Sequence, residues 1–117
     1  MKKIIVLFAL IGFFINSCVV KNNGNIEKQI QNPHVTLIDV READELINDG
    51  KIDKAVHIPK DEIKNHVEEI KKMPKPIVIF CRSGARAQVV TDFLKEKGIK
   101  KVYNGGGLQD IKTILGK

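Results

Sequence analysis

Apolar residues follow two alternating patterns from about residue 35 to the end of the chain. A continuous apolar run, typical of a strand buried in a parallel sheet, occupies residues 77–80, and short segments at 35–40, 55–58 and 101–104 are also predicted to be strands. Apolar positions three or four residues apart predict amphipathic helices at residues 42–48, 61–72, 84–97 and 108–115. This alternation predicts an α/β fold with three layers, α/β/α, around a mostly parallel central sheet. Functional sites of such folds lie at the carboxyl ends of the strands.

Local signals add detail to three of these elements. The helix at 61–72 is expected to be continuous, with Ile63, Val67 and Ile70 on one face, because Pro74 and Pro76 stop it only afterwards. The glycine run at 105–107 predicts a turn before the closing helix. The helix at 84–97 is expected to pack through five apolar residues, which are Ala85, Val89, Val90, Phe93 and Leu94.

The first 17 residues have the pattern of a secretory signal peptide. Lys2 and Lys3 precede an apolar run at residues 4–15, which is shorter than the roughly 20 residues that a membrane-spanning helix needs. The run ends in Ile15-Asn16-Ser17-Cys18, which resembles the lipobox of bacterial lipoproteins. The resemblance implies an exported lipoprotein anchored in a membrane through acylated Cys18, with its domain in the periplasm or at the cell surface. An ordinary signal peptide, with Cys18 incidental, is the alternative.

Residues 18–33 are polar and rich in asparagine, with too little apolar surface to pack. They predict a lipidated tether that runs into a short helix near residues 26–30. The expected organisation is a signal peptide at 1–17, the tether at 18–33 and one domain at 34–117. A chain of 117 residues with 43% apolar content has room for one such domain.

The formal net charge of +6 says little by itself about which partners the protein binds. Most lysines lie among Glu and Asp, as at residues 60–72, which is typical of a solvated helix face. Tyr103 and five phenylalanines are the only aromatic residues, and they are not interleaved with basic ones. This argues against nucleic-acid binding. The positive charge instead suits an anionic substrate or a membrane surface.

Cys81 is the remaining thiol if Cys18 is acylated, so the mature chain has no internal disulfide. It lies where the most apolar strand ends and shortly before the predicted helix at 84–97 begins. A loop of small residues there can turn its amide N–H groups toward an anion, reinforced by the helix dipole. Lowering a thiol pKa by about two units needs roughly 2.7 kcal/mol, which such bonds and the dipole can supply. A reactive thiolate is therefore predicted without a histidine base, and a buried inert cysteine is the alternative.

The motif Cys81-Arg82-Ser83-Gly84-Ala85-Arg86 closely resembles the active-site loop of single-domain rhodaneses. Three further segments, at residues 37–42, 49–59 and 102–107, resemble other signatures of that family in the same order. The chain departs from the family pattern at Lys51, Lys54 and Ala87 and has no tryptophan after the glycine run. These departures concern structure more than chemistry.

The resemblance implies a sulfurtransferase that needs no cofactor and no metal. Cys81 would attack the outer sulfur of a small anionic donor such as thiosulfate, and a thiol or cyanide would then take the sulfur from the Cys81 persulfide. Arg82 and Arg86 would attract the donor, and the amides of residues 83–87 (Ser83, Gly84, Ala85, Arg86 and Ala87) would stabilise the persulfide. Asp39 and Arg41 are interpreted as a buried strand-end pair that orders neighbouring loops. The sequence is compatible with a monomer.

Two other functions stay open at this point. Phosphatases and arsenate reductases of the related Cys-x5-Arg type use a longer loop around a tetrahedral oxyanion, whereas Arg86 is the fifth residue after Cys81. A non-catalytic persulfide carrier, sensor or docking module could use the same fold. The presence of Cys81 with both arginines favours transfer chemistry over docking alone.

Overall fold

The computed structural model describes residues 23–117, whose strands form one parallel sheet. The strands are β1 (Thr36–Asp39), β2 (Val56–His57), β3 (Ile77–Cys81) and β4 (Val102–Gly107), in the order β2-β1-β3-β4. Every neighbouring pair runs parallel. The predicted α/β class is confirmed. No helix of the described residues is both long and apolar enough to cross a membrane.

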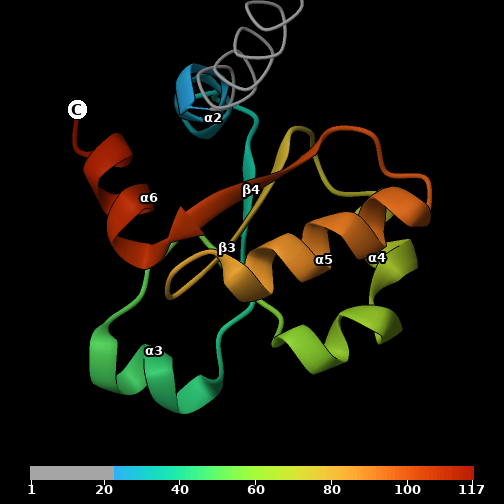
Figure 1. Cartoon of the computed structure of the whole chain (residues 1–117), viewed down its shortest axis with the longest axis horizontal. Coiled ribbons are helices and arrows are strands. Elements are labelled where there is room, and N and C mark those ends of the chain that lie inside the picture. Colours follow the sequence, from blue (N-terminus) through green and yellow to red (C-terminus); the bar gives the residue numbers. More distant parts are fainter. Residues whose placement is uncertain (1–22) are drawn as a thin grey trace, which may run out of the picture.

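Helices cover both faces of the sheet (Figure 1). On one side lie α5 (Ala85–Glu96), the 3₁₀ helix η1 (Lys60–Asn65) and α4 (Val67–Lys71), and on the other lie α2 (Asn23–Ile30) and α6 (Leu108–Leu115). Strand β3 is buried at all five positions because it faces both layers: Ile77, Ile79 and Cys81 join one apolar cluster, while Val78 and Phe80 join the other. The remaining helix, α3 (Ala43–Asp49), has no buried residue.

Helix α2 differs from the expected polar tether. Ile30 is fully buried and Ile26 packs in the same cluster, alongside residues of α6 and β4. Two isoleucines four residues apart lie on one face of a helix, so even this asparagine-rich segment presents an apolar surface. The packed domain therefore includes residues before His34. Cys18 and the predicted signal peptide lie outside the described residues.

The helix predicted at residues 61–72 is interrupted at His66, where the 3₁₀ helix η1 ends and α4 begins. Its predicted apolar face is nevertheless present, since Ile63 and Ile70 are buried and Val67 packs against their cluster. The spacing of apolar residues reports which side chains face the core. It does not distinguish one continuous helix from two short ones of different hydrogen-bond pattern.

The buried face of α5 is rotated from the predicted one. Its buried residues are Ala87, Val90, Thr91 and Leu94, whereas Ala85 is exposed and Val89 is 55% exposed. Thr91 can be buried because its hydroxyl donates a hydrogen bond of 2.7 Å to the carbonyl of Ala87. The prediction considered only apolar residues and therefore left out Thr91, whose hydroxyl is hydrogen-bonded within the helix.

The glycine run at 105–107 is part of strand β4 and not a turn. Gly107 pairs with Cys81, and a Cβ atom on Gly107 would lie 2.1 Å from the carbonyl oxygen of Arg82. A Cβ on Gly105 would lie 2.5 Å from the side chain of Val78. The glycines thus let β4 continue against β3 and the loop that follows Cys81. Their role is close backbone approach, which extends the strand to the site.

Replacing Gly107 by alanine should therefore destabilise the domain by about 1–3 kcal/mol, because the added methyl group has to displace the backbone of Arg82. Urea unfolding followed by circular dichroism measures this. Gly116→Ala is the matched control, since Gly116 also has a negative φ (−80°) and a Cβ there has its nearest contact at 3.3 Å. Equal stability of the Gly107→Ala variant and the control would contradict the steric argument.

Candidate functional site

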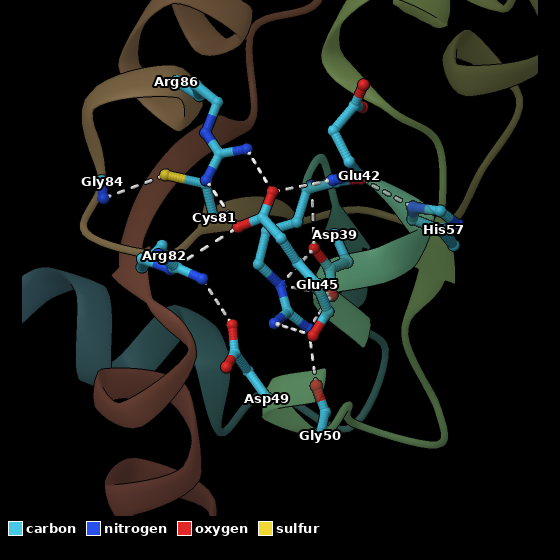
Figure 2. A network of polar contacts seen from close by, with 11 residues as sticks. Asp39, Glu42, Glu45, Asp49, Gly50, His57, Cys81, Arg82, Gly84 and Arg86 are labelled. Atoms are coloured by element: carbon cyan, nitrogen blue, oxygen red, sulfur yellow. Dashed lines mark hydrogen bonds and ion pairs between the residues drawn. The ribbon is translucent and has the colours of Figure 1, made fainter. Parts of the chain in front are cut away.

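The site is built around the sulfur of Cys81, the last residue of β3. Three residues separate it from α5, and the third, Gly84, has φ +106°, a left-handed conformation that suits glycine. This turn brings the backbone N–H of Gly84 to 3.0 Å from Cys81 Sγ, to which it donates a hydrogen bond (Figure 2). The side chain itself is buried. The short loop thus folds back over the sulfur.

Two opposing effects act on the Cys81 thiol. Burial raises its pKa, while the backbone amides of Ala87, Gly84, Ser83 and Arg86 lower it, and the net pKa lies below the ordinary value for cysteine. Four of the five amides expected from the sequence therefore act on the sulfur. The loop stabilises a thiolate with backbone groups, as predicted for a strand-to-helix cradle.

Arg86 is held by a carboxylate of α3 and does not project freely into the site. Its Nη1 and Nη2 donate hydrogen bonds of 2.6 and 2.9 Å to Oε1 and Oε2 of Glu45. Hydrogen bonding from Arg86 lowers the pKa of Glu45 to about 2, against the effect of burial, and the same pair raises the pKa of Arg86. This is the two-pronged geometry of the strongest Arg–carboxylate pairs.

Arg82 is paired in the same way with α3, although it is more exposed. Its Nη2 lies 2.5 Å from Oδ2 of Asp49 and its Nε lies 3.6 Å from Oε2 of Glu45. The sequence prediction assigned both arginines to an anionic donor, whereas the structure shows both engaged with carboxylates. Glu45 was not singled out from the sequence, because a Glu in the first turn of a helix is ordinary and its partner is 41 residues away.

Asp39 and Arg41 form a buried ion pair at the end of β1, with Nη2 of Arg41 2.7 Å from Oδ2 of Asp39. Arg41 also donates to the carbonyls of Gly50, at 2.9 Å, and Glu45, at 3.4 Å. His57 Nε2 lies 2.7 Å from the carbonyl oxygen of Arg41. The pair therefore attaches both ends of α3 to the sheet. This geometry fits the structural role expected for it.

Asn104 of β4 is a further residue that the sequence reasoning missed. Its Nδ2 donates to the carbonyl of Gly84 at 3.0 Å, and its Oδ1 accepts from the N–H of Gly106 at 2.8 Å. The side chain thus connects the glycine run to the residue whose N–H faces the sulfur. No motif signals this role, because it depends on β4 lying beside the loop.

The Glu45–Arg86 pair should be visible in the acid unfolding of the protein. A carboxylate whose pKa is lowered on folding stabilises the native state above its unfolded pKa, here about 4.5, and that contribution disappears as pH falls toward 2. Glu45→Gln should therefore lower stability at pH 7 by about 2 kcal/mol, after allowance for partial exposure, with the deficit shrinking between pH 4.5 and 2. Urea unfolding at several pH values measures this. Asp44 is an exposed carboxylate of the same helix, so the stability of Asp44→Asn relative to the wild type should not change over this pH range.

Comparison with known proteins agrees with this architecture. The family model described as "Rhodanese-like domain" matches residues 23–113, which includes helix α2. A protein of Bacillus subtilis named as a putative sulfurtransferase, YtwF, is 42% identical over 82 residues, covering 70% of this chain and 78% of that protein. A protein of Schizosaccharomyces pombe named as a putative mitochondrial thiosulfate sulfurtransferase is 33% identical, with 89% of each chain covered.

Among solved structures, the rhodanese-related protein from Thermoplasma volcanium superposes with a TM-score of 0.62 at 28% identity, covering 79% of this chain and 88% of that one. The shared sheet and the relatives named as sulfurtransferases support a transferase activity. With a matching model over most of its length, this chain belongs to the family of rhodanese-like domains.

Proposed function

We propose that this domain is a sulfurtransferase in which Cys81 carries the transferred sulfur as a persulfide. The observation that carries the proposal is the buried sulfur of Cys81 at the centre of a loop whose amides lower its thiol pKa. A thiolate is the nucleophilic form of cysteine, and the same amides favour the negative charge of a persulfide. The relatives from Bacillus subtilis and Schizosaccharomyces pombe are both named as putative sulfurtransferases, which also supports the proposal.

The reaction consists of two displacements at sulfur. With thiosulfate, the small anionic donor expected from the sequence, the Cys81 thiolate attacks the outer sulfur, the S–S bond breaks, and its electron pair leaves with sulfite. Cys81 then carries a persulfide. A thiolate or cyanide attacks its outer sulfur and the Cys81 thiolate returns as the leaving group. This mechanism uses no second residue as a base, because the loop amides favour the thiolate and neither displacement removes a proton.

The geometry gives less support to oxyanion chemistry of the phosphatase type. That reaction needs cationic groups for the oxygens of a tetrahedral anion, and the guanidinium of Arg86 is already bonded through two nitrogens to Glu45. A persulfide carrier would use the same loop as an enzyme, so the loop geometry does not separate the two functions. They differ in whether the protein passes the sulfur to an acceptor repeatedly.

Incubating the protein with thiosulfate should add one sulfur atom to Cys81, and adding cyanide should remove it with repeated release of sulfite. Cys81→Ser should lose both reactions by more than a thousandfold, because a serine hydroxyl stays protonated in this loop. Intact-mass spectrometry and a sulfite assay measure the two steps. Persulfide formation without turnover would identify a carrier instead, and normal sulfite release by the serine variant would falsify the proposal.

We propose further that the domain is held at a bacterial membrane by acylation of Cys18, with the domain in the periplasm or at the cell surface. In a bacterial host, labelled palmitate should enter the wild-type chain and leave Cys18→Ala unlabelled, since only a cysteine at that position can be acylated. The variant should also leave the membrane fraction or keep its signal peptide. A Cys18→Ala chain that is processed and still membrane-bound would contradict lipid anchoring.

A further inference from the structure

The charged groups around the Cys81 loop balance one another. Figure 2 shows the guanidinium groups of Arg82 and Arg86 directed at the carboxylates of Glu45 and Asp49. The buried pair of Asp39 and Arg41 is internally neutral. Glu42, at the start of the same helix, adds a further negative charge near Arg86. Together, the charges of these seven side chains leave no surplus of positive charge.

Arg86 forms an ion pair with Glu45 of α3, and its positive charge also interacts with Cys81. The charge of Cys81 acts on Arg86, and Oε1 of Glu45 lies 2.6 Å from Nη1 of the same arginine, so Glu45 is one ion pair away from an anion at the sulfur. Glu45 is 15% exposed at its side chain, and its screening by water is correspondingly weaker than that of Asp49, which is 42% exposed. An approaching donor therefore meets the negative charge of Glu45 as well as the positive charge of Arg86.

Because the side-chain charges balance, the main attraction for an anion at this site comes from the backbone amides. One of these amides, the N–H of Gly84, lies 3.0 Å from Sγ of Cys81. Attraction by Arg86 and repulsion by Glu45 each act on a dianion twice as strongly as on a monoanion. Because Glu45 is paired with Arg86, it cancels much of the extra attraction that this arginine would give a dianion. The site therefore stabilises one negative charge at the sulfur, and a second negative charge on the donor gains little net attraction.

We propose that Glu45, held by Arg86, is a specificity-determining residue that disfavours dianionic sulfur donors and thereby favours donors of lower charge. The proposal rests on the sulfurtransferase function proposed above. The favoured class comprises organic thiosulfonates and hydropersulfides. With a thiosulfonate, the Cys81 thiolate takes the outer sulfur, the S–S bond breaks, and the electron pair leaves with an organic sulfinate. With a hydropersulfide, a thiolate leaves and the proton stays on the transferred sulfur.

Thiosulfate and methanethiosulfonate form a matched pair of probes, because both present an outer sulfur bonded to an oxidised sulfur and they differ by one unit of charge. The measurement is kcat/KM for each donor at pH 7 and low salt, with cyanide as acceptor. In Glu45→Gln, the ratio of the thiosulfate value to the methanethiosulfonate value should rise about tenfold over the wild type. Asp49→Asn should raise it less, and the exposed control Asp44→Asn should leave it unchanged.

Salt provides a second readout, because screening acts on the difference in charge between the two donors. The gain in Glu45→Gln should largely disappear near 1 M salt, where the screening length is about 3 Å. The ratio compares two donors on the same sample, so a variant that is partly unfolded still reports its selectivity. An unchanged ratio in Glu45→Gln, or an equal change in Asp44→Asn, would overturn the inference.

The two proposals fail in distinguishable ways. If the wild-type protein forms no persulfide with either donor, the proposed sulfurtransferase function is wrong. If it takes sulfur from both donors and Glu45→Gln leaves their ratio unchanged, only the role of Glu45 is wrong.

Discussion

A thiolate at the end of a fully buried strand is separated from water, and burial alone would keep Cys81 protonated. The loop after β3 opposes this with amide groups, and the surrounding structure holds those amides in place. Gly84 supplies the left-handed turn, Asn104 bonds to its carbonyl, and Gly107 lets β4 pass beneath Arg82. The glycine run and the last strand are thus part of the site, even though none of these glycines contributes a side chain.

Helix α3 is attached to the domain in an unusual way, because it has no buried residue. Its connections are polar: Arg86 and Arg82 bind its carboxylates, and Arg41 binds carbonyls at its start and just beyond its end. Ion pairs of partly exposed groups weaken with salt, whereas apolar packing does not. The position of α3, and with it the charge around the sulfur, therefore depends on the same arginines that the loop places beside Cys81.

The departures from the family pattern have little effect on this arrangement. Lys51 and Lys54 are exposed, so neither side chain disturbs the core. Ala87 is buried in the first turn of α5, and its contribution to the thiol is made by its backbone N–H, which any residue except proline supplies. A loop that acts through its backbone tolerates changes of side chain as long as its turn is kept.

Much of the fold and the loop around Cys81 could be predicted from the sequence, because they depend on neighbours along the chain. The apolar run of β3 predicted a strand buried on both faces, and Cys81 followed by small residues and a helix predicted the amide cradle. Interactions between distant segments could not be predicted in this way. The pairing of Arg86 with Glu45 spans 41 residues, the packing of Ile30 needs α6 beside it, and the glycine run becomes a strand only where it meets β3. Local sequence thus determined where the Cys81 sulfur lies, whereas tertiary structure decided the charge around it, since that charge depends on which helix lies beside the loop.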